Sequence, residues 1–354
     1  MRNPMFRRIA PFLAFAAALA AVQALATGCG AEYYLTQLTM SAYYSLPVLG
    51  LCLLMGYAGQ ISIGQAAFFA IGGYCAAVTT TGNLVPYQGK GALALLEKAG
   101  LLVERTNLYG MPILHLSPWA GLVLAIGLSA GVAFLIGIPV LKLKGHYLAM
   151  ATLGFGIIIY RIVLGGKAFN AADGITDVPA FHLAGGIAVS GGMSERVMNY
   201  YFAFFLVLIV MLLFSNLIRS RMGRALAAIH GNEEAARSCG VDTAGTKLTV
   251  FILSAVCAAL GGFFLTHYNG GIGPSEATVM KSIRYVAIVA AGGMASLWGT
   301  LILGIVLNFL SLRGYFGSYD DAVFGVILIL IMLFAPDGIF KIRRIRQPRV
   351  ETHG

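Results

Sequence analysis

The sequence predicts an all-α fold, a polytopic bundle of membrane helices with about ten membrane segments and both termini in the cytoplasm. The first observation is composition, because 58% of the 354 residues are hydrophobic and 11% are charged, and the mean hydropathy is +0.82. Soluble domains carry about 25% charged residues and disordered chains need low hydrophobicity, so both classes are excluded. The second observation is the length of the uncharged stretches, and the third is the one-sided placement of Lys and Arg.

Uncharged stretches locate the membrane segments, because a full span needs about 20 mostly apolar residues. The stretch between Glu32 and Lys90 is long enough for two spans and is divided by a Gly-rich interruption. Arg7 and Arg8, followed by an apolar run, begin either an uncleaved first span or a cleavable secretory signal. The predicted spans lie near residues 9–28, 33–55, 62–82, 117–140, 146–166, 198–218, 248–268 and 322–340.

The stretch 285–312 is predicted to form two short segments rather than one span. Lys and Arg collect on the cytoplasmic side of membrane proteins, and one span here would place the basic C-terminal tail outside. A break within Gly292–Gly299 keeps that tail inside, and such broken helices, including re-entrant ones, are tolerated where they pack inside protein. Fifteen of the 24 Lys and Arg residues then lie on the inner side. Residues 1–340 form one predicted transmembrane domain with a cytoplasmic loop at 219–247, and a basic cytoplasmic tail follows at 341–354.

No segment carries the signature of an enzyme. The sequence has no nucleophile elbow, P-loop or Cys/His metal spacing, so we expect no catalytic residue, no metal and no cofactor. No interleaving of basic and aromatic residues indicates nucleic acid. The predicted spans hold no Asp, Glu, Lys or Arg except Arg161 and Asp337, each near a span end. Because ion-coupled carriers place such residues inside the membrane, we expect no energy source within this chain.

The Gly-rich interruption Gly56–Gln65 is a candidate site for a polar solute. Its glycines let the backbone leave helical geometry and expose N–H and C=O groups, while close helix packing through small residues is the alternative. Similar breaks are predicted at Thr152–Gly156 and at 170–176, and the latter can also be a plain solvent turn. The predicted solute path comprises Gly59, Gln60, Ser62, Gln65, Thr152, Gly154, Asp173 and Gly174.

The loop 219–247 is predicted to contain a short helix that a partner protein can approach. Asn232 can cap its start, acidic residues in its first turn complement the helix dipole, and Gly240 can end it. A connecting amphipathic helix is the alternative interpretation. The candidate docking residues are Glu233, Glu234, Ala235, Ala236 and Gly240.

Five stretches resemble one family of membrane proteins. Glu234-Ala235-Ala236 followed by Gly240 is similar to the EAA loop of ABC importer permeases. The other four resemble the branched-chain amino acid permeases of the LivM and LivH type, and YLAMATLGFG favours the LivM branch. They are GYAGQISIGQAAFF at 56–69, YLAMATLGFG at 147–156, GGMASLWG at 292–299 and APDG at 335–338. The chain departs from the family pattern at Gln65, at Ile157 and at 170–174.

This resemblance implies a multi-pass permease subunit of an ABC importer in the bacterial inner (plasma) membrane. The implied partners are two cytoplasmic ABC ATPase subunits, a second, LivH-type permease, a periplasmic solute-binding protein and the lipid bilayer, with no nucleic acid. ATP hydrolysis would reside in the ATPases, and the loop 219–247 would couple them to the permease. Branched-chain amino acids or related small solutes are the implied cargo. Urea, short amides and aromatic acids use similar permeases, and an ATP-independent channel or carrier is a further alternative.

Overall fold

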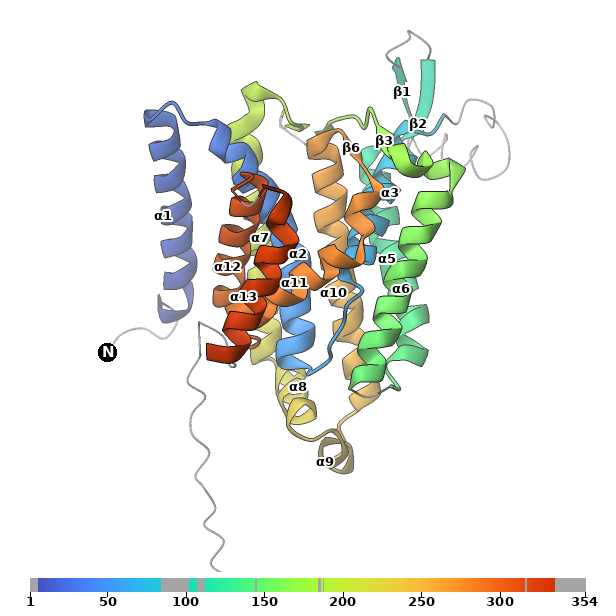
Figure 1. The fold of residues 1–354 in the computed structure, drawn as a ribbon, viewed down its shortest axis with the longest axis vertical. Helices are drawn as coiled ribbons and strands as arrows, with labels where there is room; N and C mark the ends of the chain where they lie inside the picture. The colour runs from blue at the N-terminus through green and yellow to red at the C-terminus, as the bar shows by residue number, and fades with distance from the viewer. Residues whose placement is uncertain are drawn as a thin grey trace, which may run out of the picture.

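The computed structural model describes residues 6–83, 102–106, 112–143, 145–183, 186, 188–315 and 317–334, which form an upright bundle of helices (Figure 1). Among the described helices, six are long and apolar enough to cross a membrane. They are α1 (Phe6–Gly28), α2 (Tyr33–Cys52) with the π-helical turn η1 (Leu53–Tyr57), α5 (Pro118–Val140), α6 (His146–Gly165), α7 (Arg196–Arg219) with the 3₁₀ turn η5 (Met193–Glu195), and α10 (Thr243–Asn269). The helical membrane bundle is therefore confirmed.

Four shorter helices complete the bundle: α3 (Gln65–Thr81), α11 (Val279–Gly292), α12 (Leu297–Leu312) and α13 (Asp320–Phe334). Each predicted segment has a helix in the described chain, but these four are shorter than a full span, so the number of ten crossings stays a prediction.

The predicted division of 285–312 is confirmed. Helix α11 ends at Gly292, Gly293 adopts a φ of 95°, and the Ser296 hydroxyl caps α12 by accepting the Gly299 N–H at 3.1 Å. The first half starts earlier than predicted, at Val279. The APDG stretch and the 341–354 tail lie outside the described residues.

Helix α10 is the centre of the bundle and packs against α2, α3 and α5. Its contact with α3 is made through glycine, since a Cβ at Gly262 would overlap the Phe69 carbonyl oxygen and a Cβ at Gly72 would overlap that of Ala259. In a membrane, small residues at such positions let two backbones approach closely, which replaces the hydrophobic driving force available in water.

Short strands make a minor correction to the all-α prediction. The described strands form three antiparallel two-stranded pairs, and Figure 1 places the labelled ones at the upper end of the bundle. The pairs are β1 (Leu102–Thr106) with β2 (Pro112–Leu116), β3 (Ile175–Thr176) with β6 (Gly271–Ile272), and β4 (Phe181–His182) with β5 (Ala188–Val189). The 3₁₀ turns η3 (Lys167–Phe169), η4 (Ala171–Asp173), η6 (Pro274–Ala277) and η7 (Gly317–Tyr319) complete the connections.

The lower end of the bundle carries α8 (Arg221–Gly231) and α9 (Glu233–Ser238), and α9 projects below the membrane helices (Figure 1). The first turn of α1 and the last turn of α13 point to the same end.

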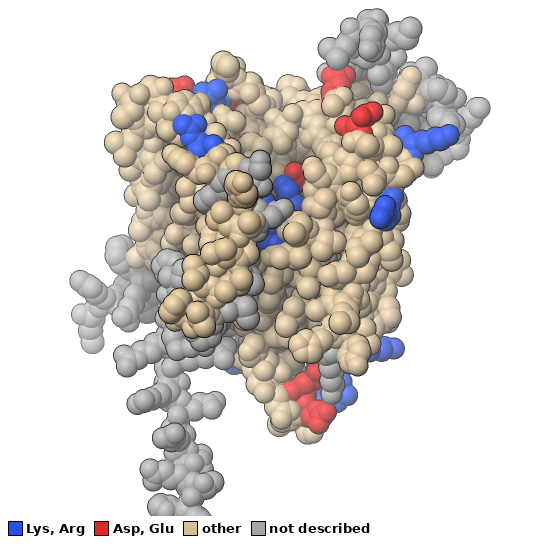
Figure 2. Space-filling view, in the orientation of Figure 1, with Lys and Arg blue, Asp and Glu red and all other residues tan. Residues whose placement is uncertain are grey.

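Charged side chains on the face shown in Figure 2 gather toward the two ends, with a further group in a recess between them. The rest of the described surface on this face is uncharged, as expected for a chain that contacts lipid.

Candidate functional site

The chain leaves helical geometry in the middle of the bundle, between α2 and α3. After the π-helical turn η1, residues 58–64 form an irregular, non-helical segment, and α3 begins at Gln65. Side chains from other helices accept the backbone N–H groups that this break releases: Thr152 Oγ1 of α6 accepts Ile63 N–H at 3.0 Å, and Ser282 Oγ of α11 accepts Ala66 N–H at 3.1 Å. The predicted interruption is confirmed, and Thr152 adjoins it.

Polar side chains of this irregular segment and of the first residue of α3 are buried without full hydrogen bonding. Gln60, Ser62 and Gln65 are each at most 3% exposed. Both amide atoms of Gln60, the Ser62 hydroxyl and Oε1 of Gln65 have no hydrogen-bond partner among the described residues, whereas Gln65 Nε2 donates to Ser254 Oγ at 2.8 Å. A buried polar group without a partner costs about 1–3 kcal/mol, so these atoms are natural partners for a polar solute or for water.

The irregular segment contacts α8 near its start, at Gly59. Gly59 has a φ of +69°, and a Cβ there would lie 2.9 Å from Nδ1 of His230. A side chain at Gly59 would thus be strained by its backbone and crowded by the histidine ring. The contact joins the candidate solute path to the end of the bundle that carries α9.

The predicted break at Thr152–Gly156 is wrong. These residues lie inside the continuous helix α6, and a Cβ at Gly154 would have nothing within 4 Å. The segment stays helical for two reasons. An isolated glycine costs a helix only about 1 kcal/mol. Breaking the helix inside a membrane would also expose backbone N–H and C=O groups for which lipid offers no hydrogen-bond partners.

The turn at 170–176 lies near the upper end of the bundle. Asn170 and Ala171 have left-handed φ values of 59° and 48°, and Asn170 Nδ2 donates to the Gly174 carbonyl at 2.8 Å. A Cβ at Gly174 would overlap the Ile272 carbonyl oxygen of β6, while Asp173 is exposed. The described contacts join this turn to β6, and none joins Asp173 or Gly174 to the Gln60 group.

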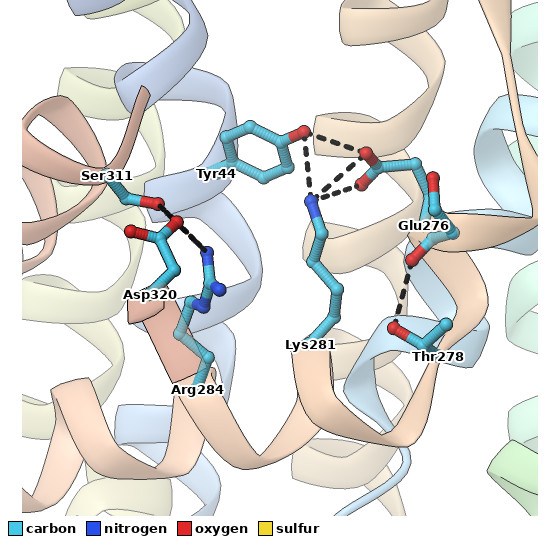
Figure 3. Close-up of polar contacts among 8 residues, drawn as sticks. Tyr44, Glu276, Thr278, Lys281, Arg284, Ser311 and Asp320 are labelled. Atoms are coloured by element: carbon cyan, nitrogen blue, oxygen red, sulfur yellow. Dashed lines mark hydrogen bonds and ion pairs between the residues drawn. The ribbon is translucent and has the colours of Figure 1, made fainter. Parts of the chain in front are cut away.

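A charged cluster beside α2 was missed from the sequence and corrects the expectation that the membrane segments lack charge. Tyr44 lies near the middle of the 25-residue span Tyr33–Tyr57, about 16 Å from its start. Its hydroxyl donates to Glu276 Oε1 at 2.9 Å, and Lys281 Nζ donates to both Glu276 oxygens at 3.0 and 3.1 Å. Lys281 Nζ also lies 4.5 Å from the centre of the Tyr44 ring. Figure 3 shows these side chains converging from α2, η6 and α11.

A second ion pair lies one turn further along α11. Arg284 Nη1 donates to Ser311 Oγ at 3.0 Å and lies 3.7 Å from Asp320 Oδ2, and the Ser311 hydroxyl donates to the same carboxylate oxygen (Figure 3). Sequence spacing placed these residues in outer loops because α11 was predicted to start after Arg284. A sequence signal for their place on a helix is the i, i+3 spacing of Lys281 and Arg284 just before an apolar stretch, because residues three apart lie on the same helix face.

A very small open pocket of about 20 Å³ lies beside the two ion pairs, which is room for about one water molecule. The fully buried Tyr285 adjoins it, and the Tyr285 hydroxyl has no hydrogen-bond partner among the described residues. The pocket is lined by Tyr44, Lys281, Arg284, Tyr285, Asn308, Ser311 and Leu312. Two cations, Lys281 and Arg284, thus border this small space, and each is paired with a carboxylate.

The helix predicted in the loop 219–247 is confirmed as α9. Asn232 Oδ1 accepts the N–H groups of Glu234 and Ala235, each at 3.0 Å, and Gly240 follows the helix with a φ of +81°. Glu233 Oε2 pairs with Lys247 Nζ of α10 at 2.5 Å. These contacts hold α9 rigidly at the lower end of the bundle.

The two alanines of α9 differ in position. Ala235 and Glu234 are exposed, but Ala236 is 5% exposed and packs inward. The expectation that both alanines offer surface to a partner is thus wrong for Ala236, because residues one apart on a helix point about 100° from each other.

In the described part of the chain, no group of three or more His, Cys, Asp or Glu side chains is placed to hold a metal ion.

The fold and the interrupted helices define a multi-pass helical membrane protein with a buried polar segment inside its bundle. Residues 33–332 match the family model described as "Branched-chain amino acid transport system / permease component". The chain belongs to this family of transport permeases.

Relatives with known roles agree with this membership. The chain is 30% identical over 326 residues to the high-affinity branched-chain amino acid transport system permease protein LivM of Salmonella typhimurium, covering 86% of this chain and 69% of the relative. It is 25% identical over 324 residues to LivH of Escherichia coli K12, covering 87% and 95%. It is also 25% identical over 253 residues to the fructose import permease protein FrcC of Rhizobium meliloti, covering 68% and 67%. No solved structure matches the chain.

Proposed function

We propose that this chain is the transmembrane subunit of an ABC importer that carries branched-chain amino acids, or related small solutes, from a periplasmic binding protein to the cytoplasm. A second, LivH-type permease would complete the pathway in the bacterial inner membrane, and two cytoplasmic ATPases would supply the energy. The observation that carries the ATP-driven mechanism is α9, a capped and exposed helix at one end of the bundle. Family membership supports the same division of labour.

The charged cluster supports a zwitterionic solute. Moving an isolated charge into a low-dielectric interior is very costly unless the charge is paired. An amino acid carries one ammonium and one carboxylate, and the ion pair beside Tyr44 presents a carboxylate from Glu276 and an ammonium from Lys281, whose charged atoms lie 3.0 Å apart. Urea, short amides and sugars have no charges that need such partners. The Gln60–Gln65 segment would then provide neutral hydrogen bonds along the same route.

Exchanging the two charges tests this role without leaving either charge unpaired. We expect the double variant Glu276→Lys/Lys281→Glu to keep the ion pair and the thermal stability, yet to lower the initial rate of leucine uptake at least tenfold, because the field that the solute meets is reversed. The single variant Lys281→Gln leaves Glu276 without its cation and should also destabilise the protein, by about 3–5 kcal/mol. Uptake is measured in vesicles that hold the complete transporter, with the amount of protein in the membrane as reference. Normal uptake by the exchanged variant would show that the pair is only structural.

The substrate is tested by competition. In proteoliposomes with all subunits, we expect excess unlabelled leucine, isoleucine or valine to suppress uptake of labelled leucine, and urea, benzoate or fructose to have no effect. The likeness to FrcC makes fructose the informative competitor. Suppression by fructose alone would contradict an amino acid substrate and would indicate a sugar permease of the same family.

The proposed topology places both termini and α9 in the cytoplasm. Two exposed cysteines allow a direct test, since Cys29 follows α1 at the upper end of the bundle and Cys239 follows α9 at the lower end. In intact cells with a permeable outer membrane, we expect a membrane-impermeant maleimide to label a variant that keeps only Cys29 and to spare one that keeps only Cys239. The reverse pattern would invert the protein in the membrane, and a shortened chain would indicate cleavage before Cys29.

A further inference from the structure

A basic groove lies at the lower end of the bundle, where α5 ends, α10 begins and α9 packs beneath them. Its volume is about 460 Å³. Three cationic residues and one carboxylate line it, together with apolar residues of α5 and α10. The lining residues used here are Lys142, Glu233, Arg237, Lys247, Ile138 and Leu141.

The charges in this groove are unbalanced. Glu233 is engaged by Lys247 at 2.5 Å and lies 3.8 Å from Arg237, and nearby Asp242 is occupied as the cap of α10, where it accepts the Gly245 N–H at 3.0 Å. The Arg237 side chain is 69% exposed, and Lys142 is exposed as well. Arg237 and Lys142 thus retain donors that can meet an anion at the groove.

An apolar stripe on α5 leads upward from this groove. Positions 124, 128, 131, 135 and 138 follow one another at intervals of three or four, so they share one face of the helix, and Lys142 continues the spacing just past its end. Leu124, Leu128, Leu135 and Ile138 are 44–69% exposed, and a Cβ at Gly131 would have nothing within 4 Å. Further up, Leu124 and Leu128 border a second, wholly apolar groove between α3, α5 and α6.

The stripe is long enough to cross one leaflet of a bilayer. From Leu124 to Ile138 the helix advances by fourteen residues, about 21 Å along its axis, whereas the hydrocarbon of one leaflet is about 15 Å thick. A basic group at the end of an exposed apolar stripe of this length lies at the level of lipid headgroups, and basic pockets between membrane helices attract anionic headgroups there.

We propose that this groove binds the phosphodiester headgroup of an anionic phospholipid. Lys142 and Arg237 contact the phosphate, and an acyl chain lies along the α5 stripe toward the apolar groove bordered by Leu124 and Leu128. This proposal concerns the surface of the chain and does not depend on the solute that the protein carries.

Binding is measured on the full-length protein in detergent, by native mass spectrometry during titration with phosphatidylglycerol or phosphatidylcholine. We expect phosphatidylglycerol to bind more tightly, and Lys142→Gln to weaken it about fivefold, as follows from about 1 kcal/mol per basic residue at an anionic surface. Lys142→Arg should restore binding. Lys167→Gln, which removes one exposed lysine beside α6 at the other end of the bundle, should leave binding unchanged.

Three results would overturn the proposal. Equal binding of the two lipids would exclude recognition of the headgroup charge. Equal weakening by Lys142→Gln and Lys167→Gln would place the site elsewhere. Competition by millimolar inorganic phosphate, with no preference for lipid, would make the groove a site for a soluble anion. Because no transport is measured, a failure here is distinguishable from a failure of the proposed import function.

Discussion

Replacing Gly262 with valine should prevent the protein from folding. The α3 and α10 backbones meet at this residue, and a Cβ would overlap the Phe69 carbonyl oxygen. The obstacle is backbone in a helix, which cannot move aside as a flexible side chain does. Overpacking a core with side chains costs about 1–3 kcal/mol, so a clash with backbone should exceed about 3 kcal/mol and remove most of a typical stability margin.

The control for Gly262→Val is Gly127→Val. Gly127 also lies inside a membrane helix, α5, but it is exposed and a Cβ there would have nothing within 4 Å. We expect Gly127→Val to give a wild-type melting temperature and a single peak in size-exclusion chromatography, whereas Gly262→Val should aggregate. A stable Gly262→Val protein would contradict the close approach of α3 and α10.

Changing the exposed face of α9 should abolish import while leaving the permease folded in the membrane. Glu234 and Ala235 are exposed on this helix, whose cap at Asn232 and ion pair at Glu233 remain intact in the variants Glu234→Lys and Ala235→Leu. A reversed charge or a larger side chain at a protein interface commonly costs several kcal/mol, so leucine uptake should fall at least tenfold. ATP hydrolysis by the assembled complex should no longer respond to solute.

Two further variants separate docking from packing. Ala235→Ser keeps the residue small and should transport normally. Ala236→Leu changes a residue that is 5% exposed, so we expect it to lower the melting temperature, whereas Ala235→Leu should not. Normal uptake by both Glu234→Lys and Ala235→Leu would show that α9 has no role in coupling ATP hydrolysis to transport.

Features governed by local sequence could be predicted well. The cap at Asn232 and the left-handed Gly240 set the ends of α9, and Gly292 with Gly293 divides α11 from α12. In both places the signal is a residue type whose conformational preference acts on its immediate neighbours. The interruption after Tyr57 belongs to the same class.

Features governed by packing could not be predicted. The Thr152–Gly156 segment resembles the true break in glycine content, but neighbouring helices do not replace its backbone hydrogen bonds, so it stays helical. The cluster of Glu276 and Lys281 escaped notice because a count of uncharged stretches treats every charge as a loop marker. Only the tertiary structure shows that Tyr44, 232 positions from Glu276 in the sequence, accommodates this carboxylate inside the bundle.

In the proposed mechanism, energy enters this permease from ATPases that dock on α9. The most direct test is uptake of labelled leucine into proteoliposomes that contain the binding protein and both permeases, with or without the ATPases and ATP. We expect accumulation only when ATPases and ATP are both present, and loss of that accumulation in the Glu234→Lys variant. Leucine uptake by the permeases alone, equal to that of the complete complex with ATP, would contradict it.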